Sequence, residues 1–283
     1  MHHIFINENE IDLPSKSIVI DSDSENYNHL VKSLRIEKDE TVLCSVDGFV
    51  YPYDYRAVVK DINSESIHLS IEENVVANEL PIIINLYQGI TKFDKLEFII
   101  EKTVELGVYS INPVATEYCI AKIEDKKIDK KIDRFNKISK SAAEQSKRHI
   151  IPKVNEPISF KQMIENIKDL KCDENKSTIK TYNLLFYENA VGMIKTKERI
   201  GEIVKNLINK NNDKIEVNVI IGPEGGFSEK EISVAKENGV DILSLGDRIL
   251  RTETATITAI SILMYEFNAI FLQNYESCDT IIN

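Results

Sequence analysis

The sequence predicts an α/β protein in which a small β-rich domain precedes a larger domain built on a parallel sheet. Three observations support this prediction. Residues 1–72 contain short apolar runs separated by turn residues, which is typical of strands. Beyond residue 74, apolar segments alternate with segments of helical period, the pattern of a parallel α/β sheet. The length of 283 residues favours more than one core. We therefore expect domains at residues 1–73 and 74–283.

The first domain is expected to consist of strands around one short helix. Turn residues such as Asp47-Gly48 interrupt its apolar runs, and the helix is expected at 27–34. The strands are expected at 18–20, 41–46, 55–59 and 67–71. Several short strands at this spacing indicate a small barrel or a sandwich.

The second domain is expected to alternate strands with helices. Gly107 stands where a helix would end, and Ser228 with Glu231 forms a capping box that opens a helix closed by Gly239. We expect strands at 82–87, 110–114, 183–187, 217–221 and 242–245, and helices at 91–106, 127–148, 194–210, 228–238 and from 252. This alternation predicts the parallel sheet.

The charge of the chain is unevenly distributed. A net charge of −11 and a pI near 5.1 argue against a nucleic-acid binder with a broad basic surface. Residues 1–72 carry six basic and fourteen acidic residues, whereas residues 122–153 carry eleven basic and five acidic ones. The basic segment is explained either by a solvated helix face or by a surface that docks RNA. Total charge therefore does not exclude an RNA partner.

Other features of the composition indicate an ordinary cytoplasmic protein. Apolar runs such as 81–86 are far shorter than the roughly 20 residues that cross a bilayer, and we expect no signal peptide and no membrane association. Cys44, Cys119, Cys172 and Cys278 are scattered without a Cys-x-x-Cys pair. We therefore expect neither a disulfide framework nor a metal site.

Two glycine-bearing loops follow expected strands. The first, 221–227, reads Ile-Gly-Pro-Glu-Gly-Gly-Phe, and its glycines would let backbone approach a ligand closely. A plain tight turn is the alternative. The second, 245–255, places a glycine, two arginines and an acid before a helix. Thr252 as a helix cap, Glu253 beside the helix dipole and a solvated Arg251 would also explain it. The first loop is neither a Walker A nor a Rossmann fingerprint.

Together these loops resemble the bacterial 16S ribosomal RNA (uracil-N3) methyltransferase family, which is of the SPOUT class with a C-terminal trefoil knot. The resemblance extends over nearly the whole chain. It includes Gln88-Gly89 with Lys92, Lys95 and Glu97, then 101–108, 111–113, 142–146 with Arg148, and 151–152. His29, Leu34-Arg35 and Asp47-Gly48 are similar to the family's N-terminal PUA-like barrel. The chain departs from the family in lacking an arginine among residues 1–5 and in reading Lys38-Asp39 where Gly-Asp is expected.

The resemblance implies S-adenosylmethionine as the cofactor, bound at the knot mostly through backbone groups. It assigns cofactor binding to Phe186, Tyr187, Glu188, Gly222, Pro223, Glu224, Gly225, Gly226, Leu245, Gly246, Ile249, Leu250 and Thr252. Because the uracil N3–H is a weak acid, a base or a cation that stabilises the imide anion would help the reaction. We expect Arg251 to stabilise the anion and Glu253 or Glu224 to accept the proton; helix-cap electrostatics is the alternative for either glutamate.

The partner implied by the resemblance is 16S rRNA, within the 30S subunit, and the expected assembly is a homodimer. We expect RNA contacts from His29, Arg35, Lys92, Lys130, Lys131, Arg134, Arg148 and Arg248, although a structural role would also explain His29. Two alternatives remain open. The chain could methylate a tRNA or a ribose, or it could be an RNA-binding assembly factor without activity.

Overall fold

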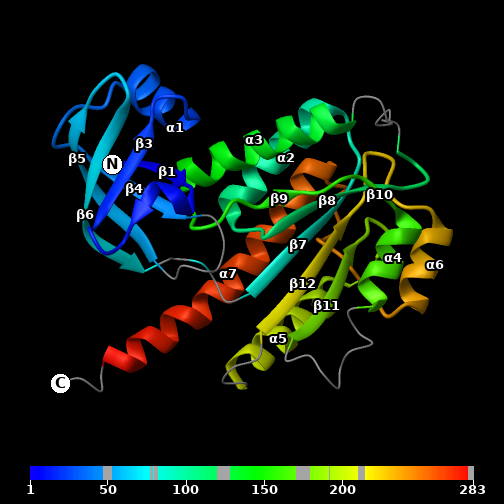
Figure 1. Cartoon of the computed structure of the whole chain (residues 1–283). Coiled ribbons are helices and arrows are strands. Elements are labelled where there is room, and N and C mark those ends of the chain that lie inside the picture. Colours follow the sequence, from blue (N-terminus) through cyan, green and yellow to red (C-terminus); the bar gives the residue numbers. More distant parts are fainter. Residues whose placement is uncertain are drawn as a thin grey trace. The chain divides into compact units, whose positions relative to one another are not determined.

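The fold was analysed in a computed structural model, which describes residues 1–46, 53–76, 79, 82–119, 128–169, 179–190, 192–209 and 214–279. The chain forms two compact units (Figure 1). The first unit comprises Met1–Glu79 with Lys140–Ile151, and the second comprises Leu80–Ser139 with Pro152–Asn283. The expected turn at Asp47-Gly48 lies outside the described residues.

A single six-stranded sheet forms the first unit. Its strands are β1 (His2–Ile6), β2 (Ile11–Asp12), β3 (Ser17–Asp21), β4 (Thr41–Val46), β5 (Tyr53–Ile62) and β6 (Ser66–Val76), in the order β1-β4-β5-β6-β3-β2. β1 and β4 pair in parallel, and the other neighbours are antiparallel. Alternate residues such as Ile4, Ile18, Val42, Val59 and Leu69 are buried in one cluster. The six strands form one sheet around one core, whereas a sandwich, one of the two expected arrangements, consists of two stacked sheets.

Short helical segments complete the first unit. They are η1 (Glu8–Glu10), α1 (Glu25–Tyr27) and the π-helical turn η2 (Asn28–Leu34), so the expected helix at 27–34 lies within one continuous helical stretch. Ser24 caps α1 by accepting a hydrogen bond from the Tyr27 backbone. Tyr27 and Leu30 then fill the core of the sheet.

The division of the chain differs in detail from the expected boundary after residue 73. β6 continues to Val76, and the first unit also includes the end of α3 (Ile128–Ser146) with the turn after it. Buried Arg148 and Glu79 connect these segments, since the guanidinium donates two hydrogen bonds of 3.1 and 2.8 Å to the Glu79 carboxylate. These two residues are 69 positions apart, so local sequence patterns did not indicate their contact.

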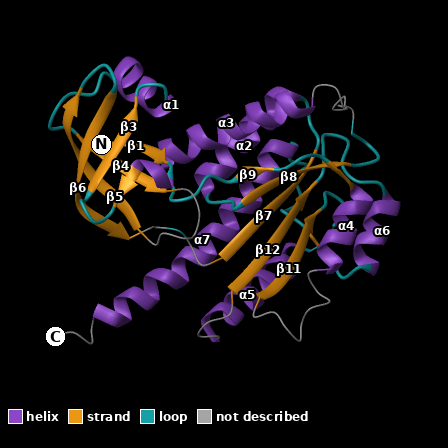
Figure 2. Ribbon diagram, viewed as in Figure 1, coloured by secondary structure: helices purple, strands orange, loops and turns teal. Residues whose placement is uncertain are grey.

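The second unit contains the expected parallel α/β sheet (Figure 2). Its strands are β7 (Ile82–Gly89), β8 (Ser110–Ala115), β9 (Lys153–Val154), β10 (Ile158–Ser159), β11 (Ile179–Phe186), β12 (Lys214–Ile221) and β13 (Asp241–Leu243). They follow the order β10-β8-β7-β12-β11-β13, β9 also pairs with β8, and every pair is parallel. Besides α3, its helices are α2 (Phe93–Leu106), α4 (Phe160–Asp169), α5 (Met193–Asn209), α6 (Glu229–Glu237) and α7 (Thr252–Asp279). The sequence did not indicate α4, β9 or β10.

Helices cover both faces of this sheet. Tyr87, Leu185 and Ile220 point to one face, where they pack against Met163 of α4 and Ala235 of α6. On the other face α7 contacts β12 and packs against α2 and α5 (Figure 2). Among the helices that the structure describes, none is both long and apolar enough to span a membrane.

The carboxyl ends of four neighbouring strands, β7, β12, β11 and β13, are aligned at one edge of the sheet. Gln88 of β7 pairs in register with Ile221 of β12, Ile221 with Phe186 of β11, and Phe186 with Leu243 of β13. The loops that leave these carboxyl ends are therefore neighbours, and ligands bind at this edge in open parallel sheets.

Candidate functional site

A cavity of about 400 Å³ opens at the carboxyl edge of the second unit's sheet. The loops after β11, β12 and β13 and the start of α7 form most of its wall. Its lining residues are Lys95, Phe186, Tyr187, Glu188, Ile221, Gly222, Pro223, Glu224, Gly226, Leu245, Gly246, Arg248, Ile249, Leu250, Arg251, Thr252 and Ala255. The residues expected to bind a cofactor therefore lie around one cavity, with Gly225 as the exception.

Gly225 has a different neighbour. A Cβ at this position would lie 2.8 Å from the backbone oxygen of Tyr118, so the absence of a side chain allows the two segments to approach each other. Gly225 is thus not among the lining residues, and its close contact is with Tyr118.

Two other glycines are required by the shape of the loops. A Cβ on Gly89 would overlap the Cδ and backbone nitrogen of Pro223 and lie 2.8 Å from the Gly222 carbonyl carbon. Gly226 has φ of +68°, and a Cβ there would lie 2.5 Å from Oε1 of Glu188. These positions tolerate only glycine without rearrangement, and they bring three loops together at the cavity.

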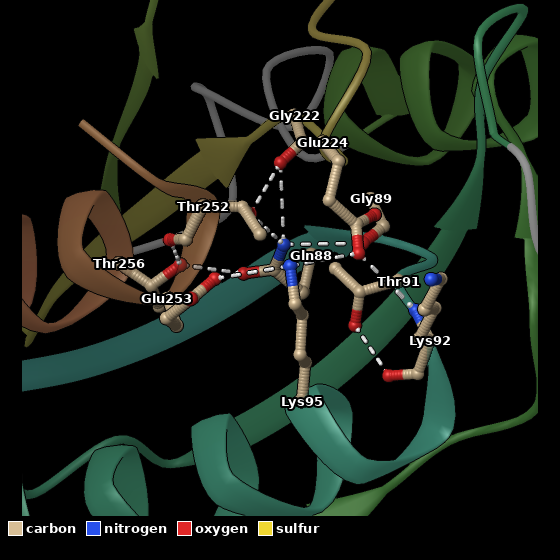
Figure 3. A network of polar contacts seen from close by, with 10 residues as sticks. All are labelled: Gln88, Gly89, Thr91, Lys92, Lys95, Gly222, Glu224, Thr252, Glu253 and Thr256. Carbon is tan, nitrogen blue, oxygen red and sulfur yellow. Dashed lines mark hydrogen bonds and ion pairs between the residues drawn. The ribbon is translucent and has the colours of Figure 1, made fainter. Parts of the chain in front are cut away.

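A buried amide ties the same loops to one another (Figure 3). Gln88, at the end of β7, is fully buried and donates from Nε2 to the Thr252 hydroxyl at 3.0 Å. The Thr252 hydroxyl donates to the Gly222 carbonyl at 2.6 Å, and Thr256 donates to Gln88 Oε1 at 2.6 Å. Every polar atom of the Gln88 side chain is therefore bonded. Thr252 connects the two glycine-bearing loops in addition to starting α7.

The charged group at the cavity is centred on Lys95 of α2 (Figure 3). Its Nζ lies 3.2 Å from Glu224 Oε1 and 3.8 Å from Glu253 Oε2. The Lys92 backbone N–H also donates to Glu224 Oε1, at 3.5 Å. Although partial burial opposes the shift, backbone hydrogen bonds and Lys95 lower the pKa of Glu224 below its ordinary value. Glu224 is therefore a carboxylate at neutral pH.

The two carboxylates differ in their surroundings. Glu224 lines the cavity, whereas Glu253 is not among the lining residues. Glu253 Oε2 is buried and lacks a hydrogen-bond partner among the residues that the structure describes. Arg251, the expected anion-stabilising residue, is exposed and lines the cavity. Lys95 was not assigned to the site from sequence, although its place in the first turn of α2, the helix that follows β7, is a signal that could have indicated it.

Most of the residues expected to contact RNA are on the surface. His29 and Arg35 are exposed in the first unit, and Lys92, Lys130 and Arg248 are exposed in the second. Lys131 is partly buried. Arg134 is exposed, with its Nε 2.6 Å from Glu97 Oε1.

Arg148 differs from the other residues expected to contact RNA in its burial. It is only 7% exposed, and its guanidinium donates two hydrogen bonds to Glu79. These bonds give Arg148 a structural contact within the first unit.

The described side chains give no indication of a metal centre. No group of three or more His, Cys, Asp or Glu residues is placed to hold a metal ion in the described part of the chain. Cys44 and Cys119 are free thiols.

Known proteins are similar to this chain in sequence and in architecture. The family model described as RNA methyltransferase domain matches residues 78–264. The chain is 34% identical over 249 residues to the ribosomal RNA small subunit methyltransferase E of Bacillus subtilis, covering 86% of this chain and 88% of the relative. The enzyme of the same name from Mesomycoplasma hyopneumoniae is 34% identical over 230 residues, with 81% and 87% covered. The chain belongs to this family of RNA methyltransferases.

Solved structures agree with this assignment. The ribosomal RNA small subunit methyltransferase E of Neisseria gonorrhoeae, bound to S-adenosylmethionine, superposes with a TM-score of 0.72 at 25% identity, covering 94% of this chain and 97% of that one. A methyltransferase of Legionella pneumophila, in complex with the same cofactor, has a TM-score of 0.71 at 28% identity, with 94% and 98% covered.

Proposed function

We propose that this enzyme transfers a methyl group from S-adenosylmethionine to N3 of a specific uridine in 16S ribosomal RNA, within the assembled 30S subunit. The observation that carries the proposal is the cavity at the carboxyl edge of the sheet, which is lined by both glycine-bearing loops and by Lys95 and Glu224. The relatives named above, which are ribosomal RNA small subunit methyltransferases, support the substrate class.

The cavity has features that fit the cofactor. Its volume is in the range of small-molecule sites, and Leu245, Ile249 and Leu250 supply an apolar wall for the adenine. Gly222 and Gly226 leave backbone accessible to the polar parts of the ligand. When bound, S-adenosylmethionine supplies an electrophilic methyl group on a sulfonium. We expect the chain around this site to form the trefoil knot of the SPOUT class.

The chain's own residues orient the uracil and handle the N3 proton. Holding the base in line with the methyl group provides much of the rate enhancement in a transfer between two bound molecules. Arg251 at the cavity edge is a candidate to stabilise the imide anion, and Glu224 or Glu253 is a candidate to accept the proton. Glu224 is ionised at neutral pH, so a carboxylate is available to accept the proton, and its lowered pKa favours release of that proton to water.

RNA binding is expected to depend on exposed cations and on the N-terminal unit. The candidates are His29, Arg35, Lys92, Lys130, Lys131, Arg134, Arg148 and Arg248; of these, Arg148 is buried and paired with Glu79. Contacts of this kind make binding weaker as salt increases. We expect the N-terminal sheet to be a PUA-like barrel that recognises RNA shape and exposed bases.

Apolar side chains beside the cavity support a homodimer. Met193, Ile194 and Ile249 are 58, 74 and 87% exposed, and Met193 lies next to Gly246 of the cavity loop. Exposed apolar clusters of this kind are typical of protein interfaces. We expect two copies to associate through this surface, in the cytoplasm where ribosomal subunits are found.

Nucleoside mass spectrometry tests the proposed reaction. Small subunits from a strain lacking the enzyme are incubated with protein and S-adenosylmethionine, and naked 16S RNA and tRNA are treated in parallel. The expected result is 3-methyluridine in 16S RNA, formed faster on subunits than on naked RNA. A ribose-methylated nucleoside or a product confined to tRNA would indicate another RNA methyltransferase. No product despite cofactor binding would indicate an assembly factor.

A further inference from the structure

The cation of this site that is fixed most firmly in place is Lys95, on helix α2. Its ammonium lines the cavity and has a carboxylate on two sides, Glu224 at 3.2 Å and Glu253 at 3.8 Å (Figure 3). The ammonium has three N–H donors, and among the residues that the structure describes its contact within hydrogen-bond distance is the one to Glu224. Donors therefore remain that a ligand in the cavity could use.

Arg251 differs from Lys95 in exposure. Arg251 belongs to the exposed residues, whereas the Lys95 side chain is 31% exposed and begins on a helix whose Leu96 and Ile99 are fully buried. A charge held in position before the reaction stabilises a developing anion better than one that must reorganise. The comparison favours Lys95 as the group that contacts the reacting base.

The two glutamates then have separate roles. Glu224 lines the cavity with Lys95, whereas Glu253 is not among the lining residues, and its buried Oε2 lacks a hydrogen-bond partner among the residues that the structure describes. A buried carboxylate oxygen without a hydrogen bond is costly unless a charge lies close by. The Lys95 ammonium, 3.8 Å away, is such a charge. The attraction between the two groups therefore holds the Lys95 side chain in position.

We propose that Lys95 is a catalytic residue that stabilises the N3 anion of uracil, that Glu224 accepts the N3 proton, and that Glu253 is a positioning residue for Lys95. This inference rests on the proposed function. In the step, the N3–H bond breaks, the proton passes to a Glu224 carboxylate oxygen, and the electron pair remains on the imide. The negative charge spreads over N3, O2 and O4, and the positive charge of the Lys95 ammonium stabilises it. Glu224 returns the proton to water.

The test compares Lys95→Met and Lys95→Arg with Lys102→Met. Lys102 is a matched control because it lies on the same helix between two carboxylates, Glu101 at 2.7 Å and Glu105 at 2.9 Å, and does not line the cavity. Each variant is assayed on 30S subunits for kcat and KM across pH, and S-adenosylmethionine binding is measured by calorimetry. Thermal unfolding verifies that each variant is folded.

For Lys95→Met we expect a loss in kcat on the order of 10²-fold, the effect of removing one preorganised donor. Cofactor affinity should remain within about threefold, and the residual rate should increase with pH over a range in which wild type is flat, because hydroxide must then ionise N3. Lys95→Arg should recover part of kcat, since it keeps the charge in another geometry. Glu253→Gln should show the same pH shift with a smaller loss.

Two results would overturn the inference. The first is a Lys95→Met variant as active as Lys102→Met, and the second is a parallel loss of cofactor affinity and kcat without a change in pH profile. If Lys95→Met does not fold, the pH profiles of Lys95→Arg and Glu253→Gln test the inference instead. Profiles unchanged from wild type in both variants would contradict the inference. Failure of the proposed function is distinguishable, because wild type would then form no 3-methyluridine.

Discussion

Two polar clusters, one in each unit, differ in what they leave available to a ligand. In the first unit, His3, Ser45, Asp54 and His149 are all less than 7% exposed. Ser45 donates to Asp54 Oδ1 and is bonded to His3 Nε2 at 2.7 Å, while His149 Nδ1 lies 2.7 Å from the same Asp54 oxygen. In the second unit, Lys95 and Glu224 line a cavity, and Oε2 of Glu253 accepts no hydrogen bond from the residues that the structure describes.

The comparison shows that residue types alone do not identify a catalytic site. Serine, histidine and aspartate are the groups of hydrolytic triads, yet here they are enclosed by protein and bonded to each other. A buried and mutually satisfied network specifies structure. Lysine and glutamate are common surface residues, but at the cavity they are partly exposed and hold donors and acceptors that the protein does not use.

Substitution of Asp54 should produce the largest effect on stability. Asp54→Ala removes an acceptor shared by Ser45 and His149, and we expect the free energy of unfolding to fall by about 3 kcal/mol. Urea denaturation measures the change. Asp61→Ala, an exposed position on the same strand, is the control and should change stability by about 0.5 kcal/mol or less. Equal effects would show that the buried cluster contributes nothing specific.

Substitution of Gly89 should affect the cavity. Gly89→Ala places a methyl group against Pro223 and should destabilise the protein by about 1–3 kcal/mol while weakening S-adenosylmethionine binding. Calorimetry and denaturation measure the two effects. Gly201→Ala, in α5 with nothing within 4 Å of its new Cβ, should instead stabilise the helix by up to about 1 kcal/mol. Unchanged cofactor affinity in Gly89→Ala would contradict the described loop contact.

Acid should destabilise the buried cluster through His3. Burial lowers the pKa of His3 below its ordinary value of 6.5, although the Asp54 carboxylate opposes the shift. Below pH 6.5 the unfolded chain therefore binds more protons at this residue than the folded protein, so its contribution to stability decreases as pH falls. The expected slope is less than about 1.4 kcal/mol per pH unit. Urea denaturation at pH 7.5 and 5.5 should show that acid lowers the free energy of unfolding less in His3→Gln than in wild type. A larger decrease in His3→Gln would contradict the lowered pKa of His3.

Sequence predicted best what depends on neighbouring residues. The parallel α/β unit was predicted because strand, loop and helix follow one another directly, and the cavity loops because their glycines and arginines stand at such junctions. Lys95 was missed because its closeness to Glu224 and Glu253 depends on the order of strands in the sheet. The burial of Arg148 was not predicted, because a basic pattern along a helix does not indicate which cation pairs with Glu79.

The most direct test of the contrast between the two clusters is a calorimetric titration of wild type, Asp54→Ala and Gly89→Ala with S-adenosylmethionine, at a temperature where all three are folded. We predict one site per chain in wild type, unchanged affinity in Asp54→Ala, and at least about tenfold weaker binding in Gly89→Ala. Absence of binding to wild type, or loss of binding in Asp54→Ala with retention in Gly89→Ala, would contradict the assignment of the cavity as the cofactor site.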